Sequence, residues 1–252
     1  MHAHRLIINV YGARIEVDAM KYTIEAVVGK YPEVKIGVLV GKGLKNVKSH
    51  PDLEKYKSES IEIAIKKLGD APISQQANIA SWREMYRSFG TKASEYHSSI
   101  EALTRRISKT RQLPTINIAV DVYNCISLRY MVPVGGFDSD RVEGDISVRF
   151  SPGNEAFMGL GMAEKEYTYS GEAVYADSNR ILTRRWNFRD CVETMITEAT
   201  KNLVMFIDGS PEMPRSEVEK ALGELCDRLE SYCRGSYSRS IADRHNPVVR
   251  ID

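Results

Sequence analysis

The chain has 252 residues, of which 42% are hydrophobic and 27% charged, and its formal net charge is +1 at pH 7. These proportions are typical of a globular protein and indicate neither disorder nor a membrane protein, since no stretch approaches roughly 18 consecutive apolar residues. A net charge near zero gives no basic field for sequence-blind binding of nucleic acid, so neither DNA nor a membrane is an expected partner. The N-terminal residues also lack the order of a signal peptide, which predicts a cytoplasmic protein.

The cysteines give no sign of a metal centre. They have no CxxC spacing and do not pair with the five histidines at zinc-finger intervals; they are Cys125, Cys191, Cys226 and Cys233. Buried, reduced thiols are the usual state of such residues in the cytosol. The sequence therefore predicts neither a metal nor a cofactor.

The N-terminal part alternates between strand and turn patterns. Residues 5–17 alternate well enough for two short strands around Gly12, and residues 35–40 predict a better strand. The following GKGLKN is interpreted as a turn, because the Walker spacing of a phosphate loop is absent. Residues 51–68 carry apolar residues at helical spacing after Pro51, a residue favoured in the first turn of a helix.

Three further helices are expected before residue 131. Residues 74–87 bury one apolar stripe, and residues 98–108 begin with Ser98 followed by Glu101, which is the capping-box pattern. Residues 117–130 keep a helical rhythm of apolar side chains.

From residue 144 onward the pattern becomes one of short alternating segments separated by Gly, Pro, Ser, Asp and Asn, which predicts mostly sheet. Residues 202–207 predict one more strand and residues 214–233 a closing amphipathic helix. The last residues, 236–252, show no periodicity and are expected to form an extended tail. The fold class is α+β, with mixed helices and a mostly antiparallel sheet in one compact body.

The central run of residues 113–138 has the layout of a site. Asp121 and Asn124 lie three apart on one helical face, just before Pro133, Gly135 and Gly136. Asp121 either closes a turn or does acid-base work. Asn124 needs a partner inside an apolar helix, either a ligand or water or the carbonyl of a neighbouring loop.

Two basic segments are candidates for contact with RNA. The run TRRWNFRDC places Arg184, Arg185 and Trp186 together, which suits phosphate contact and base stacking but also an aromatic edge strand with a solvated cationic face. Arg105, Arg106 and Lys109 form a basic edge along and just after the predicted helix of residues 98–108, and this edge is either an RNA contact or a solvated face.

Taken together, several segments resemble one family in their order and spacing. They resemble the free-standing B3/B4 proteins, which are similar in turn to the B3/B4 editing module of the phenylalanyl-tRNA synthetase beta subunit. The likeness covers about residues 35–235, and its motifs lie at 82–107, 113–138, 144–150, 171–177 and 184–190. It implies a B3/B4 domain between an N-terminal extension, residues 1–34, and a C-terminal tail, residues 236–252.

The resemblance also implies an activity and a site. The synthetase module hydrolyses the ester of wrongly attached tyrosine, and free-standing relatives look like trans-editing factors. Asn124 falls on the family asparagine, Gly135 on the family histidine, and Asn187 near the family glutamate, with no carboxylate until Asp190. The small residues that line the amino-acid pocket correspond to Ala176 and Asp177.

Because the histidine and glutamate are absent, tyrosine is not the expected substrate. We expect hydrolysis of mischarged aminoacyl-tRNA in trans, with a small amino acid such as serine. Asn124 and the backbone of Gly135 and Gly136 would orient the water and ester, and residues 184–186 would meet the CCA end. The alternatives are a non-catalytic tRNA or RNA-binding module and an enzyme of free amino-acid esters or nucleotides. The oligomeric state stays open.

Overall fold

The computed structural model describes residues 5–10, 13–18 and 20–251. The helices are α1 (Glu25–Val28), α2 (Pro51–Leu68), α3 (Ala77–Ser88), α4 (Ser99–Thr110), α5 (Ile118–Tyr130) and α6 (Arg215–Cys233), with 3-10 turns η1 (Ile73–Gln75) and η2 (Ser139–Arg141). The strands are β1 (Arg5–Val10), β2 (Ala13–Asp18), β3 (Lys21–Thr23), β4 (Lys35–Lys42), β5 (Val134–Asp138), β6 (Ile146–Phe150), β7 (Ala156–Phe157), β8 (Glu166–Tyr167), β9 (Ala173–Ala176), β10 (Ile181–Arg184), β11 (Arg189–Asp190), β12 (Leu203–Gly209), β13 (Ser236–Ala242) and β14 (Val248–Arg250).

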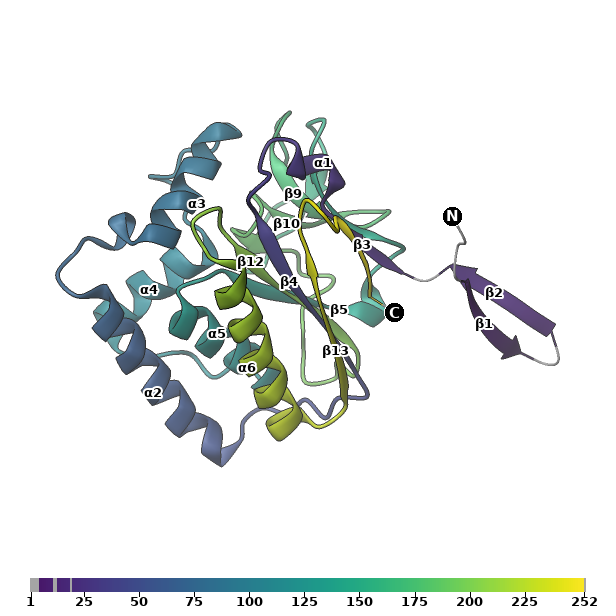
Figure 1. The fold of residues 1–252 in the computed structure, drawn as a ribbon, viewed down its shortest axis with the longest axis horizontal. Coiled ribbons are helices and arrows are strands. Elements are labelled where there is room, and N and C mark those ends of the chain that lie inside the picture. The colour runs from purple at the N-terminus through teal and green to yellow at the C-terminus, as the bar shows by residue number, and fades with distance from the viewer. Residues whose placement is uncertain (1–4, 11–12, 19, 252) are drawn as a thin grey trace.

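Two sheets form the centre of the protein (Figure 1). The first has the strand order β13-β4-β12-β5, and the second has the order β11-β10-β9-β6-β3-β14. All pairs within these sheets are antiparallel except β3 with β6. The α+β class and the mostly antiparallel sheet predicted from the sequence are therefore confirmed.

Alternate side chains of β12 pack into the two apolar layers of the core on either side of the first sheet. Val204 and Phe206 belong to the apolar cluster shared with the second sheet, whereas Met205 and Ile207 pack in the cluster that contains residues of α5 and α6. Successive side chains of a strand point to opposite faces, and a strand buried on both faces is apolar along its length. Figure 1 shows α2, α5 and α6 on one side of the first sheet and the second sheet on the other.

Most of the predicted helices begin and end within two residues of their expected limits. Ser98 accepts a hydrogen bond from the backbone N–H of Glu101 at 3.4 Å, as the capping-box pattern predicts. Helix α5 begins after Asn117 and ends at Tyr130, where Met131 takes a left-handed conformation with φ of 52°. The helix thus ends before Pro133, and Gly135 and Gly136 belong to β5.

The two ends of the chain differ from the expected extension and tail. Tyr22 of β3 is fully buried, and β3 pairs with β6 and β14, so residues from 21 onward belong to the core. Strand β13 pairs with β4 along its whole length. The segment after residue 235 is extended, as expected, but it completes both sheets and is not a tail. The two strands expected around Gly12 are β1 and β2, while Gly12 itself lies outside the described residues.

Candidate functional site

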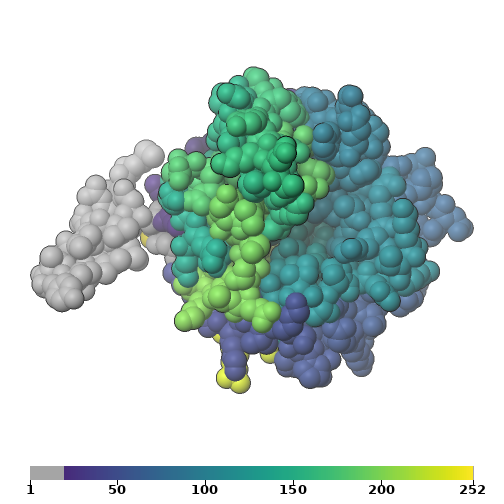
Figure 2. Space-filling view, turned by 180° about the vertical axis from the view of Figure 1, so that it is seen from behind, coloured from purple at the N-terminus to yellow at the C-terminus, as the bar shows by residue number. Residues whose placement is uncertain are grey.

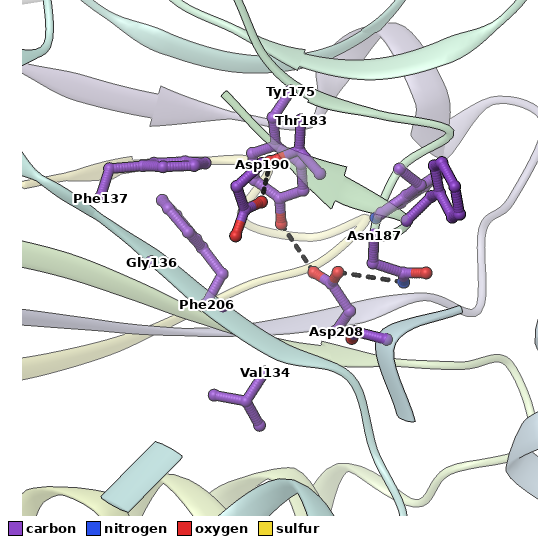
Figure 3. Close-up of a pocket in the computed structure, with 13 residues that line it drawn as sticks. Val134, Gly136, Phe137, Tyr175, Thr183, Asn187, Asp190, Phe206 and Asp208 are labelled. Carbon is purple, nitrogen blue, oxygen red and sulfur yellow. Dashed lines mark hydrogen bonds between the residues drawn. The ribbon is translucent and has the colours of Figure 1, made fainter. Parts of the chain in front are cut away.

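A small cavity lies between the two sheets, along β5 (Figure 3). Its volume is about 50 Å³. It is lined from β5, β9, β10, β11, β12, the turn before β11 and the start of α4, by Ser99, Val134, Gly135, Gly136, Phe137, Tyr175, Thr183, Trp186, Asn187, Phe188, Asp190, Phe206 and Asp208. A water needs roughly 10 to 15 Å³ by such a measure, so the cavity has room for a few waters or a small side chain.

Asp208 forms the deep side of the cavity. Asp208 follows Phe206 by two residues on β12, so both side chains face the second sheet. Only 4% of Asp208 is exposed. Its Oδ1 accepts a hydrogen bond from the Tyr175 hydroxyl at 2.6 Å, and its Oδ2 accepts one from Asn187 Nδ2 at 3.2 Å. Burial raises the pKa of Asp208 to about 7, the charge of Asp190 adds to the rise, and these hydrogen bonds oppose it. The group therefore titrates near neutral pH.

Asp190 is the more accessible carboxyl group, being partly exposed on β11. Its Oδ1 accepts a hydrogen bond from Thr183 Oγ1 at 2.6 Å, and its Oδ2 accepts none from the described part of the chain. Burial raises its pKa to about 6, against the effect of the Thr183 hydroxyl. At pH 7 this group is mostly ionised and has a free oxygen.

The two glycines of β5 have different roles. A Cβ on Gly136 would lie 2.7 Å from both the Val204 carbonyl oxygen and Met205 Cγ, so the close approach of β5 to β12 requires glycine there. A Cβ on Gly135 would meet only Asp190 Oδ2, at 3.8 Å. The absence of a side chain at residue 135 thus keeps the cavity open beside the free oxygen of Asp190.

The pairing register also frees a backbone donor. Asp208 donates its N–H to the Pro133 carbonyl, and Asp138 donates its N–H to Thr194, away from β12. Antiparallel pairs alternate between bonded and non-bonded residues, so Gly136, opposite Met205, turns its N–H to the open edge of β5. Gly136 lines the cavity, which gives the site a backbone donor near the carboxyl groups.

A strained turn holds Asn187 in the cavity. Arg185 and Trp186 have φ of 51° and 65°, and left-handed backbone costs about 1 to 2 kcal/mol at each such residue. The turn is fixed by the hydrogen bond from the Trp186 N–H to the Ala173 carbonyl at 2.7 Å. Asn187 then accepts a hydrogen bond from the Tyr86 hydroxyl at 2.9 Å while it donates to Asp208.

The structure differs from the expectation that residues 184–186 present a surface to RNA. Trp186 is fully buried, with its ring edge-on to Trp82 at 5.4 Å between centroids, so it cannot stack on a base. Arg184, 3% exposed, pairs with the buried Glu172 at 2.7 Å. Arg185, 5% exposed, lies over the Tyr96 ring at 3.7 Å. Residues 184–186 are therefore part of the protein core. Arg184 is paired with a buried carboxylate, and Arg185 and Trp186 pack against aromatic rings.

Three other predicted residues also have structural roles. Asp121 is buried, pairs with Lys57 at 3.3 Å and accepts the N–H of Ile116, so its turn-closing interpretation fits. Asp177 accepts backbone N–H groups from Glu143 and from residues 179 and 180, which fixes a turn. Ala176 is fully buried in β9 and does not line the cavity.

Asn124 and the basic edge of α4 lie at the surface. Asn124 is partly exposed on α5, outside the cavity lining, and its side chain makes no hydrogen bond within the described residues. The preceding residue, Tyr123, lies near enough to Asp190 for that charge to add to the burial that raises its pKa. Arg105, Arg106 and Lys109 are exposed, and they follow Ser99, which lines the cavity from the same helix.

Asp208 and Asp190 are cavity residues that were not predicted from the sequence to belong to the site. Asp208 ends an apolar strand, and Asp190 follows the arginine-rich run; both signals are visible in the sequence as acidic residues at strand ends. Tyr175 and Thr183, which hydrogen-bond them, were missed as well because nothing local distinguishes them from other strand residues.

Two mostly antiparallel sheets with helices on one face, and a small acidic cavity between the sheets, define an α+β domain with an inter-sheet binding site. Residues 81–234 match the family model described as B3/4 domain. This match covers more than half of the chain, which therefore belongs to the B3/4 domain family, as its sequence motifs predict.

The solved structures offer a weaker likeness. The chain is similar to an N-terminal fragment of the phenylalanyl-tRNA synthetase beta subunit from Pyrococcus horikoshii, with 14% identity and a TM-score of 0.41. The likeness covers 86% of this chain and 49% of the fragment, so the chain spans about half the length of that fragment. No curated protein matches the sequence. None of the described helices is long and apolar enough to cross a membrane.

Proposed function

We propose that this protein hydrolyses the aminoacyl ester of mischarged tRNA in trans, in the cytoplasm, with a small amino acid as the group removed. The family and its resemblance to the synthetase editing module support the reaction class. The observation that carries the proposal is a pair of carboxyl groups, the buried Asp208 and the partly exposed Asp190, at a cavity of about 50 Å³. A cavity of about 150 Å³ binds benzene, so this smaller cavity favours a small side chain over an aromatic one.

Asp190 is suited to act as general base. Its Oδ2 is free, and a base with a pKa near the working pH combines sufficient ionisation with sufficient basicity. Asp190 would take a proton from water as the oxygen of that water attacks the ester carbonyl carbon. The tetrahedral intermediate then expels the ribose oxygen, which regains the proton, and the products are the free amino acid and uncharged tRNA.

The neighbouring polar groups would stabilise the charge that develops. The Gly136 N–H at the open edge of β5 is a backbone donor for the carbonyl oxygen, and such donors are worth roughly 3 to 4 kcal/mol in acyl transfer. Asn124, with no hydrogen bond of its own in the described residues, is proposed to orient water or the ester from α5. An aminoacyl ester is already activated, so positioning supplies much of the rate.

The exposed side of α4 is proposed to contact RNA phosphates. Ser99 lies in the cavity lining and Lys109 ten residues later, which is about 15 Å along a helix. Arg105 and Arg106 lie between them and are exposed. An acceptor stem could therefore follow the basic edge of α4 while its aminoacylated end enters the cavity.

The test is a deacylation assay with a panel of tRNAs charged with serine, alanine, glycine or tyrosine. Wild-type protein should release a small amino acid faster than buffer, and Asp190→Asn should lose this activity. Asp140→Asn is the matched control, since Asp140 is an exposed carboxylate that pairs with Asn202. No release above buffer with any of the four substrates contradicts the proposal.

The alternative is a binding module without catalysis, and the basic edge of α4 is the observation that favours it. Both functions predict binding of tRNA that weakens when Arg105, Arg106 and Lys109 are neutralised. Binding without any deacylation supports the module, and deacylation lost in Asp190→Asn supports the enzyme.

A further inference from the structure

The cavity contains two carboxyl groups and no counter-charge. In the described part of the chain neither Asp190 nor Asp208 pairs with a lysine, arginine or histidine; their neighbours are neutral, namely Thr183 for Asp190, and Tyr175, Asn187 and the Trp186 indole for Asp208. Buried carboxylates are normally paired with a cation because an isolated buried charge is costly. The missing cation is an indication of what the cavity binds.

We propose that the cavity binds a primary ammonium group at Asp208, and that Gly135 limits the size of the group attached to it. This inference rests on the proposed function, for which it means that the substrate must have a free α-amino group and a small side chain. Aminoacyl esters with a blocked amino group would then be excluded.

Asp208 has the geometry of a prepared binding group. Tyr175 and Asn187 each donate one hydrogen bond to it and the Trp186 indole N–H lies close to it, which leaves at least one of the roughly four lone-pair sites of a carboxylate for a ligand. The donors are themselves held: the Tyr175 hydroxyl lies 3.2 Å from that of Tyr22, and Asn187 accepts from Tyr86. A carboxylate fixed by such a network needs no rearrangement to bind a cation.

The size and composition of the cavity favour an ammonium over other cations. An ammonium has three donors in a compact group, whereas a guanidinium is larger and planar. Hard metal ions take six or more oxygen ligands, and no cluster of three or more His, Cys, Asp or Glu side chains suitable for a metal occurs among the described residues. The second carboxylate, Asp190, adds negative charge that attracts a cation to the cavity.

Gly135 controls the space next to this group. Its backbone is in a strand with no left-handed φ, so alanine is compatible with the conformation. The added methyl carbon would lie 3.8 Å from Asp190 Oδ2, an ordinary contact distance, and would occupy part of the cavity. Gly135→Ala is therefore expected to fold and to reduce the volume available to a ligand.

The experiment measures binding of small amides by ligand-observed NMR. Wild-type protein should bind L-alaninamide more tightly than N-acetyl-L-alaninamide by about tenfold or more, an effect of roughly 1.4 kcal/mol. Asp208→Asn should remove this preference, while the exposed control Asp140→Asn keeps it. Gly135→Ala should weaken binding of L-serinamide relative to glycinamide. Equal binding of the two alanine amides, or binding of neither, overturns the proposal, as does competition by MgCl2 against L-alaninamide.

A second arm separates this inference from the proposed function. Wild-type protein is given alanyl-tRNA and N-acetylalanyl-tRNA, and only the first should lose its amino acid. If both are hydrolysed equally, the ammonium site is wrong while the hydrolase stands. If neither is hydrolysed but L-alaninamide binds selectively, the hydrolase is wrong while the ammonium site stands.

Discussion

Replacing Asp208 by asparagine should stabilise the folded protein at pH 8, although this residue lies in the candidate site. Burial raises the pKa of Asp208 to about 7, whereas an aspartate in an unfolded chain titrates near 3.9. Between these values the folded state keeps a proton that the unfolded state has released. The free energy of unfolding therefore falls as the pH rises from about 4 to 7.

The size of the effect follows from the shift. About three pKa units correspond to a penalty on the order of 4 kcal/mol once Asp208 is ionised. Asparagine is neutral at every pH and removes this penalty, but its amide replaces an oxygen that accepts a hydrogen bond, at a cost of roughly 1 kcal/mol. We expect Asp208→Asn to exceed wild type by about 3 kcal/mol at pH 8, and to lie within about 1 kcal/mol of it at pH 5.

Urea unfolding followed by tryptophan fluorescence measures this difference, because Trp82 and Trp186 are both buried. Taking the difference between the variant and wild type at each pH cancels the other titrating groups, including His97, whose pKa burial lowers. A difference that is the same at pH 5 and pH 8 would show that the pKa of Asp208 is not raised in the folded protein.

Three further predictions test other parts of the site. The rate of deacylation at low substrate concentration should rise with pH from 5 to 7, since Asp190, with a pKa of about 6, must be ionised to act as base; a rate independent of pH in this range contradicts this role. Arg184→Ala should lower the free energy of unfolding by about 3 to 5 kcal/mol in the same urea assay, because it leaves the buried Glu172 without its partner. Asn124→Ala should change stability by less than about 0.5 kcal/mol, since its side chain makes no hydrogen bond in the described residues, but should reduce turnover in the deacylation assay; unchanged turnover excludes it from the site.

The sequence was a good guide to local structure. Pro51 and Ser98 mark helix starts by physical effects that act within one turn, namely a fixed φ and a hydrogen bond to a nearby N–H. The motifs of residues 81–234 were sufficient to predict the family. The last residues were harder to interpret, because β13 obtains its stability from pairing with β4, about two hundred residues earlier, and has no alternation of its own.

The site residues were harder to predict because their chemistry depends on distant neighbours. Arg184, Arg185 and Trp186 are residue types that usually bind nucleic acid at a surface, and only tertiary packing against Glu172 and Tyr96 reveals that they are core. Conversely, Asp208 looks like an ordinary turn residue after a strand. Its position toward the second sheet is fixed by strand parity, and its raised pKa by burial beside Asp190.

Near residue 135, the titratable group of the site comes from a different strand than the resemblance implies. The resemblance places the family histidine at Gly135, where this chain has no side chain at all. The structure brings Asp190 Oδ2 within 3.8 Å of the position that a Cβ would take there. A titratable group with a pKa of about 6 therefore lies next to residue 135 after all, but it comes from β11 rather than from β5. Because a carboxylate accepts protons and attracts cations, this exchange allows base chemistry while it changes which substrates the cavity can hold.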